Sequence, residues 1–296
     1  MQISFLKYKK IYFIFSGILI LASLLCLIVF GLKPGIDFTG GSILEIEYIE
    51  ERPSNQEIKE TLSGLDLGEV LVQPTEERGA ILKMKDIPED AHQEVLEKLK
   101  ENKELEERRF ESIGPVIGQE LKQKTKIAIV LSLMAIVLYI AWAFRKISRP
   151  LPSWQYGIAS LIVLFQDVFI PIGIFSVLGK LYGVQITIPV IAALLTVLGY
   201  SINNVVVVFD RIRENLLKHV GTYQEIVNNS LNQTLTRSIN TSLTTLFVLV
   251  AIFFLGGETL KYFALALILG ILCGTYSSIF LASPILVAWL RWRQRG

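Results

Sequence analysis

Six long stretches of the 296-residue chain are filled with apolar residues and hold almost no charges. About 20 consecutive apolar residues are enough for a helix to cross the ~30 Å hydrocarbon core of a bilayer. The last stretch is longer than a bilayer requires, so we expect its helix to tilt or to extend into the interface. The pattern predicts six membrane spans, at 11–32, 126–144, 155–178, 186–209, 239–256 and 262–290.

The first stretch, 11–32, has the features of a retained span rather than of a cleaved signal peptide. Lys7, Lys9 and Lys10 precede it, as basic residues precede both kinds of segment. The apolar run is long, however, and no Ala-x-Ala cleavage site follows it. We therefore expect 11–32 to remain as the first membrane helix.

Basic residues indicate which way the spans face, because cytoplasmic loops are enriched in lysine and arginine. Six spans place four basic clusters on one side, whereas the opposite short loops, 179–185 and 257–261, hold only Lys180 and Lys261. We expect 1–10, 210–238 and 291–296 in the cytoplasm and 33–125 outside. The four clusters are Lys7, Lys9 and Lys10; Arg145, Lys146 and Arg149; Arg211, Arg213, Lys218 and Arg237; and Arg291, Arg293 and Arg295.

The long segment 33–125 has the pattern of a small α/β domain. Residues 41–50 alternate apolar and polar side chains, as a half-buried strand does. Ser54, followed by Glu57, forms a capping-box pattern that opens a short helix. Three more strands are expected in GEVLVQP, GAILKMK and ERRFESIG, and a second helix after Pro88. The order is β-α-β-β-α-β, which predicts a ferredoxin-like core at about 41–113.

Composition supports a membrane protein and excludes several kinds of chemistry. The chain is 52% hydrophobic, with a mean hydropathy of +0.50 and a net charge of only +2. Cys26 and Cys273 both fall in apolar stretches and have no ligand spacing, and His92 and His219 lie in polar segments. We therefore expect no disulfide framework, metal site, cofactor or catalytic histidine. Mixed charges without an aromatic platform also argue against nucleic-acid binding.

Asp167 is the only acidic residue well inside a predicted span. An ionised carboxylate there costs at least ~2.5–3.5 kcal/mol, so it must be protonated, paired or exposed to a wet cavity. Two interpretations stay open, a proton-binding or gating group and a structural hydrogen bond between helices.

Further polar residues form a stripe near the cytoplasmic ends of two spans. Asn203 and Asn204 interrupt the fourth span, and structural hydrogen bonding is a serious alternative to a functional role for them. By depth, Asn204 and Arg237 are candidates to meet. The fifth span begins with polar residues at helical spacing, namely Arg237, Asn240, Thr241, Thr244 and Thr245.

Small residues recur every fourth position in the last span: Ala266, Gly270, Gly274 and Ser278. Such a ladder permits close helix contact. Whether the partner helix belongs to this chain or to another stays open at this point.

Five motifs resemble the SecF branch of the SecD/SecF protein-export family, within the RND superfamily. They are GIDFTGG (35–41), IGPVIG (113–118), GYSINNVVVVFDRIREN (199–215), SLNQTLTRSINTSLTT (230–245) and FALALILGILCGTYSSIFLASPIL (263–286). Their order and spacing over nearly the whole chain make the resemblance specific. The motif residues include Gly35, Asp37, Gly40, Gly41, Gly199, Asp210, Arg211 and Arg213.

The resemblance implies a multi-pass helical membrane protein of six spans, half of an RND-type unit, with an external domain after the first span. It implies a non-enzymatic subunit in the bacterial cytoplasmic membrane that pairs with a SecD-like subunit. Further implied partners are the SecYEG channel, the SecA motor and exported preproteins. Export would then draw on the proton-motive force.

Two departures from the family pattern bear on that energy source. The family usually has SIND where this chain has Ser201-Ile202-Asn203-Asn204, so Asn204 replaces an acid associated with proton conduction. The third span commonly has HD, where this chain has Gln166-Asp167. Arg237 matches the family's functional arginine. We hypothesise a relay between Arg237 and an acid of the partner, to which Asp167 contributes, and the coupling ion, H⁺ or Na⁺, stays open.

Other function classes fit less well. A lone RND-type exporter of small molecules or lipids usually carries larger or duplicated external domains. An intramembrane protease needs a Ser/His pair, paired aspartates or a metal site, and one aspartate provides none of these. A purely structural scaffold predicts export that is insensitive to collapse of the proton gradient.

Overall fold

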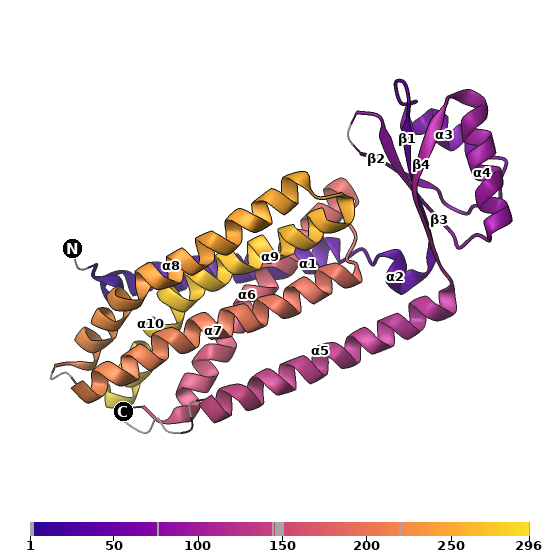
Figure 1. Cartoon of the computed structure of the whole chain (residues 1–296). Coiled ribbons are helices and arrows are strands. Elements are labelled where there is room, and N and C mark those ends of the chain that lie inside the picture. The colour runs from indigo at the N-terminus through magenta and orange to yellow at the C-terminus, as the bar shows by residue number, and fades with distance from the viewer. Residues whose placement is uncertain (1–2, 76, 144, 146–150, 219–220, 296) are drawn as a thin grey trace. The chain divides into compact units, whose positions relative to one another are not determined.

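The chain divides into two compact units in a computed structural model that describes residues 3–75, 77–143, 145, 151–218 and 221–295 (Figure 1). One unit comprises residues 1–33 and 128–296 and is helical, and the other comprises 34–127 and contains a sheet. Lys146, Arg149 and His219 of the sequence analysis lie outside the described residues.

Six helices in the described chain are long and apolar enough to cross a membrane, which confirms the expected number. The last crossing changes to a π-helical turn, η2, before its final segment. The elements of this unit are η1 (Phe5–Tyr8), α1 (Lys9–Phe30), α5 (Pro115–Ala143), α6 (Ser153–Tyr182), α7 (Ile188–Lys218), α8 (Tyr223–Leu255), α9 (Glu258–Ser277), η2 (Ser278–Ala282) and α10 (Ser283–Arg295).

The segment 210–238, which we expect in the cytoplasm as loop and helix, is mostly helical among its described residues. α7 continues to Lys218, and α8 begins at Tyr223 after a capping box formed by Thr222 and Glu225. Hydropathy marks where a span leaves the apolar layer, but the polar and charged residues beyond that point are compatible with continued helix. The helices are therefore longer than their apolar parts.

α6, α7 and the last crossing form the centre of the helical unit, and half or more of the apolar window of each is buried. α1 packs closely on α6, because Gly173 leaves no room for a side chain: a Cβ there would lie 2.5 Å from the Cβ of Ser23. Ser176 donates a 2.9 Å hydrogen bond to the carbonyl of Cys26 in α1. Small residues thus give helix contact in the bundle as in other membrane proteins.

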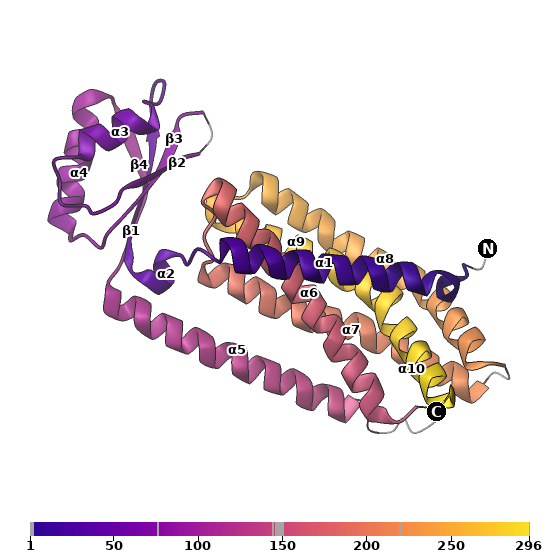
Figure 2. The same cartoon turned by 180° about the vertical axis from the view of Figure 1, so that it is seen from behind.

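Both ends of the chain lie beside the first turns of α8. The backbone N–H of Phe5 donates to Oδ1 of Asn228 at 2.9 Å. Arg291, in the last helix, donates to Oε1 of Gln224 at 2.7 Å. The two termini therefore lie at the same end of the helical unit, as an even number of crossings requires (Figures 1 and 2).

The second unit has the ferredoxin-like topology that the sequence predicts. Four antiparallel strands lie in the order β2-β3-β1-β4, and α3 and α4 cover one face of the sheet (Figure 2). The elements are β1 (Gly41–Tyr48), α3 (Asn55–Leu62), β2 (Leu71–Thr75), β3 (Gly79–Met84), α4 (Glu89–Asn102) and β4 (Leu105–Ile113).

Alternation in β1 explains how the sheet forms its core. Leu44, Ile46 and Tyr48 are buried, whereas Glu45 and Glu47 lie on the other face and are partly exposed. The capping box at the start of α3 is present: the N–H of Glu57 donates to Oγ of Ser54, and the N–H of Ser54 donates to Oε2 of Glu57. These two local signals were sufficient to place the first strand and helix.

Candidate functional site

A buried carboxyl group lies where three membrane-type helices meet. Asp167 of α6 is fully buried, and its Oδ2 accepts a hydrogen bond from the hydroxyl of Ser201 in α7. Ser277, at the end of α9, also interacts with this carboxyl through its side chain. Oδ1 of Asp167 has no hydrogen-bond partner within the described chain. Sequence reasoning identified Asp167 but missed the two serines, because hydroxyls of this kind are common in membrane helices.

The small-residue ladder of α9 is what brings these helices together. A Cβ on Gly270 would lie 2.2 Å from Cγ2 of Val197 in α7, and a Cβ on Gly274 would lie 3.2 Å from the Cβ of Ser201. Ala266 and Ser278, in phase with these glycines, are fully buried. The partner that the sequence left open is therefore α7 of the same chain.

Two further polar side chains lie inside the bundle without protein partners. Gln166, next to Asp167, is fully buried, and neither polar atom of its amide has a hydrogen bond within the described residues. The Nδ2 group of Asn204, which is 4% exposed, also has none. A buried polar group without a partner costs about 1–3 kcal/mol, which is unusual in a folded protein.

A second polar group faces outward from the bundle. Asn203 of α7 and four residues of α8 are exposed, although all lie in candidate membrane spans. Arg237 has no ion pair and no hydrogen bond within the described part of the chain. The four residues of α8 are Arg237, Asn240, Thr241 and Thr244; with Asn203 we call them the outward stripe.

Asn204 and Arg237 do not interact in the structure. Asn204 points into the bundle, whereas Arg237 lies on its surface, and no hydrogen bond joins them within the described residues. Equal depth along two helices does not determine the direction of a side chain. The adjacent residues Asn203 and Asn204 also face different ways: Asn203 is exposed, and Asn204 is buried.

Hydroxyl groups connect α7, α8 and α9 between the buried carboxyl and the outward stripe. Tyr200 donates a 3.0 Å hydrogen bond to Oγ of Ser242, and Ser242 lies 2.6 Å from Oγ1 of Thr275. Tyr200 precedes Ser201 in α7, so the same helical turn contributes to these hydroxyl contacts and to the hydrogen bond with Asp167. Sequence reasoning did not select Tyr200 or Ser242.

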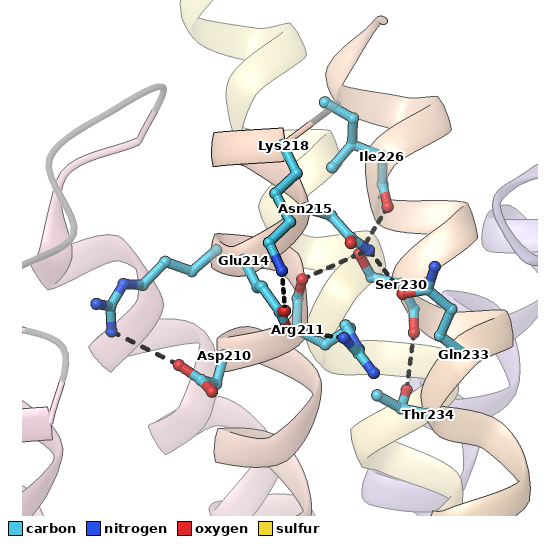
Figure 3. Close-up of polar contacts among 10 residues, drawn as sticks. Asp210, Arg211, Glu214, Asn215, Lys218, Ile226, Ser230, Gln233 and Thr234 are labelled. Carbon is cyan, nitrogen blue, oxygen red and sulfur yellow. Dashed lines mark hydrogen bonds and ion pairs between the residues drawn. The ribbon is translucent and has the colours of Figure 1, made fainter. Parts of the chain in front are cut away.

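The charged end of α7 is held to α8 by an asparagine that sequence reasoning also missed (Figure 3). Asn215 is buried and donates to Oγ of Ser230 at 2.8 Å and to Oε1 of Gln233 at 2.9 Å. The hydroxyl of Ser230 in turn donates to the carbonyl of Ile226 at 2.8 Å. This network joins the last turns of α7 to the first turns of α8.

The expected motif residues at this end form ion pairs along one helix. Arg211 pairs with Glu214 at 2.6 Å, and Lys218 pairs with the same carboxylate at 2.5 Å. Arg213 lies 3.5 Å from Oδ1 of Asp210 (Figure 3). Pairs of this i,i+3 and i,i+4 type contribute only ~0.2–0.5 kcal/mol each. Their main effect is therefore to place charge at the end of the span.

The glycines of the GIDFTGG motif meet a steric need at the entrance to the sheet. Gly40 and Gly41 have φ values of 75° and 132°. A Cβ on Gly41 would lie 2.7 Å from the carbonyl oxygen of Met84, and a Cβ on Gly118 would lie 2.8 Å from the backbone nitrogen of Gly40. Gly118 belongs to the IGPVIG motif, so the two motifs pack against one another. Gly35 is the N-cap of the short helix α2 (Ile36–Thr39), and Asp37 lies in its first turn.

His92 in the sheet unit has a structural environment. Its ring stacks on Phe110 with 3.7 Å between ring centroids, and its Nδ1 lies 3.0 Å from Oε1 of Glu89. Hydrogen bonds from Gln93 and His92 lower the pKa of the Glu89 carboxyl group. No cluster of three or more metal-ligating side chains exists among the described residues.

Comparison with known proteins agrees with these features. The family model "Protein export membrane protein SecD/SecF, C-terminal" matches residues 92–292, and the "SecD/SecF GG Motif" model matches 27–48. The protein translocase subunit SecF of Thermobaculum terrenum is 40% identical over 97% of this chain and 94% of its own. SecF of Anaerolinea thermophila is 35% identical over the whole of this chain and 98% of its own.

A longer relative contains a segment similar to this chain. Protein translocase subunit SecDF of Thermus thermophilus is 40% identical over 94% of this chain, which covers 37% of that protein. The crystal structure of SecDF from that organism, described as translocon-associated, matches with a TM-score of 0.85 at 34% identity. The match covers 98% of this chain and 39% of the solved chain.

These relatives are translocase subunits, a non-catalytic role, and the fusion suggests a SecD partner. The six apolar helices and the SecF relatives imply a multi-pass membrane protein. The chain belongs to the SecD/SecF family of protein-export membrane proteins, and its role is that of a SecF subunit in protein export.

Proposed function

We propose that this chain binds a SecD-like subunit through the outward stripe and couples export to the proton-motive force at that interface. The observation that carries the proposal is the exposure of Arg237 and its neighbours in candidate membrane spans. Arg237 lies at the cytoplasmic edge of the expected span 239–256, where a charged side chain on a lipid-facing surface needs a polar partner, water or the interface. A second membrane subunit supplies such partners.

The remaining members of the stripe fit the same interface. Asn203, Asn240 and Thr241 offer hydrogen-bonding groups that lipid tails leave unsatisfied. The hydroxyl of Thr244 donates to the carbonyl of Asn240 at 3.0 Å. Interhelical hydrogen bonds in membranes contribute ~0.6 kcal/mol on average, so the stripe favours a specific partner without making the interface rigid. An interface that rearranges during each export cycle must be specific for its partner but not rigid.

Proton coupling requires a titratable group at or near the interface. Asn204 cannot change its charge, so it acts as a neutral hydrogen-bonding group. We place the relay on Arg237 and an acid of the SecD-like subunit, to which Asp167 contributes from inside the bundle. One charge that crosses 100 mV releases about 2.3 kcal/mol, enough to bias two conformations of the external domain by more than tenfold.

The proposal includes the orientation of the chain in the membrane and its partners in export. Both termini lie in the cytoplasm, and the sheet unit lies outside the bacterial cytoplasmic membrane, as the basic clusters indicate. There the pair assists the SecYEG channel and the SecA motor in the export of preproteins. Neither a metal nor an organic cofactor takes part.

A photo-crosslinking experiment tests the interface. A photoreactive phenylalanine analogue replaces Thr244 of the stripe, and a matched variant carries it at Leu138 of α5, which is 69% exposed. We expect an adduct with the SecD-like subunit from Thr244 and little from Leu138. Equal adducts from both positions, or an adduct with a second copy of this chain, would contradict the proposal, and the second result would favour a homo-oligomeric exporter.

Collapse of the gradient tests the coupling. Export of a preprotein into inverted membrane vesicles is measured with and without a protonophore, in vesicles that contain or lack this chain. We expect the increment due to the chain to vanish when the gradient collapses. An increment that survives would support a scaffold role instead.

A further inference from the structure

An apolar groove lies within the helical unit, and its lining includes none of the polar residues described above. It has a volume of about 490 Å³ and lies between α5, α6 and α7. Every residue that lines it is aliphatic or aromatic, so no side chain there can hold a water molecule. Among them are Leu133, Ile136 and Val137 of α5, Phe165 and Val168 of α6, and Leu195 of α7.

A groove of this size is not a packing defect. An engineered apolar cavity of about 150 Å³ already binds small apolar molecules, and this one is about three times larger. Side chains that line an empty groove lack dispersion contacts on that side, so binding of an apolar group is favoured. Leu133, Val137 and Phe165 are 45%, 44% and 54% exposed, which shows that the groove opens sideways to the medium around the helices. In a bilayer that medium is lipid.

Two lysines lie at one end of this groove. Leu32 and Ile186 line the groove, and the N–H of Ile186 donates a 2.7 Å hydrogen bond to the carbonyl of Lys33. The side chain of Lys33 runs over Gly179, where a Cβ would lie 3.8 Å from its Cγ. Lys180 follows directly and is also exposed. Neither ammonium group has an ion pair or a hydrogen bond within the residues that the structure describes.

An apolar channel that ends at two unpaired ammonium groups matches the chemistry of an anionic phospholipid. The acyl chain requires only apolar walls, and the phosphate requires cations at the level of the headgroups. A partner helix would fit the apolar walls but would leave both charges without a counterion unless it carried acids at the same level. The charge at the end of the groove therefore favours a lipid.

We propose that the groove between α5, α6 and α7 binds one acyl chain of an anionic phospholipid, whose phosphate contacts Lys33 and Lys180. This site is separate from the outward stripe, so it does not depend on the function proposed above. A bound lipid fills the space beside α5 and ties this helix to the bundle.

Electron paramagnetic resonance of spin-labelled lipids tests the proposal. The full chain, together with its SecD-like subunit, is reconstituted with phosphatidylglycerol that carries a nitroxide near the end of one acyl chain. A chain held in the groove gives an immobilised spectral component. We expect Leu133→Trp, which fills the groove, to reduce this component strongly. The matched variant Leu138→Trp, on the opposite face of α5, should leave it unchanged.

The headgroup is tested separately. The double variant Lys33→Gln/Lys180→Gln should lower the preference for phosphatidylglycerol over phosphatidylcholine by roughly thirtyfold, the size expected for two lysines near an anionic lipid. Ile136→Phe serves as a second groove-filling variant if Leu133→Trp does not accumulate in the membrane.

Three outcomes would overturn the proposal. An immobilised component that is equal in Leu133→Trp and Leu138→Trp would show ordinary boundary lipid. A component that is present in the isolated chain but lost in the complex would show that a helix of the partner covers the groove. A lipid preference that is unaffected by the lysine changes would remove the phosphate contact.

Discussion

Ser201 of α7 donates its hydroxyl hydrogen bond to Oδ2 of Asp167 in α6, and α9 passes directly over this pair. A Cβ on Gly274 would lie 3.2 Å from the Cβ of Ser201 and 3.5 Å from Oδ2 of Asp167. One buried carboxyl group is therefore enclosed by three helices, one turn along α9 from the tight contact of Gly270 with Val197. Changes in helix packing and changes in the carboxyl group can be tested separately.

Gly270→Leu tests the packing. Because a Cβ at this position would lie 2.2 Å from Cγ2 of Val197, α9 must move away from α7, at a cost of about 1–3 kcal/mol or more. We expect a lower thermal midpoint of the detergent-solubilised protein. Gly199→Ala is the control, because a Cβ there meets nothing within 4 Å and alanine favours helix. Equal midpoints for the two variants would show that α7 and α9 are not in close contact.

Asp167→Asn and Asn204→Asp test the titratable groups. The amide oxygen of asparagine at 167 still accepts the hydrogen bond from Ser201, so we expect the fold to persist and gradient-dependent export to fall. Aspartate at 204 adds a carboxyl group inside the bundle, and we expect a new pH dependence of export. Both are measured in vesicles over a range of pH. If Asp167→Asn changes nothing while Asn204→Asp creates the new dependence, the contribution assigned to Asp167 is wrong.

Asn215→Ala tests the joint between α7 and α8. It removes hydrogen bonds to Ser230 and Gln233 in a buried position, so we expect a loss of about 1–3 kcal/mol. Hydrogen exchange should rise in the first turns of α8. Asn229→Ala is the matched control, because this neighbouring side chain makes no hydrogen bond within the described chain. A uniform rise over the whole helical unit would indicate general destabilisation instead of a local joint.

Tyr48→Phe tests the core of the sheet unit. Burial raises the pKa of Tyr48 to about 12, against 10.0 for an exposed phenol, and the nearby Arg52 acts in the opposite direction. The unfolded chain therefore loses this proton first, and the contribution to stability is present below pH 10 and is lost as pH rises toward 12.

The measurement is the ultraviolet difference titration between the native chain and Tyr48→Phe. We expect the missing phenol to titrate near pH 12 in the folded protein and near pH 10 in denaturant. A midpoint near 10 in both conditions would place Tyr48 at the surface.

The sequence was a good guide to elements whose information is local. Alternation in β1, with Leu44 and Ile46 opposite Glu45 and Glu47, is a property of neighbouring residues. The capping box of Ser54 and Glu57 spans three positions. The number of spans depends only on apolar length. These features led to the ferredoxin-like domain and the six helices.

The candidate site was predicted less completely because its contacts are distant in sequence. Ser201 and Asp167 are 34 positions apart, and nothing in either segment selects the other. Asn203 and Asn204 differ by one position, yet helix packing alone decides which faces the interior. Asn215 was missed for the same reason, since a polar residue among charges gives no sign of burial.

The length of α8 has a mechanical consequence. The helix has 33 residues, and at 1.5 Å per residue it is ~50 Å long, well beyond the ~30 Å apolar layer of a bilayer. Arg237 and the partners of Asn215 therefore belong to one uninterrupted rod. The contacts of Asn215 join the charged end of α7 to the same helix that carries Arg237. A displacement of the first turns of α8 therefore also moves the level of the outward stripe.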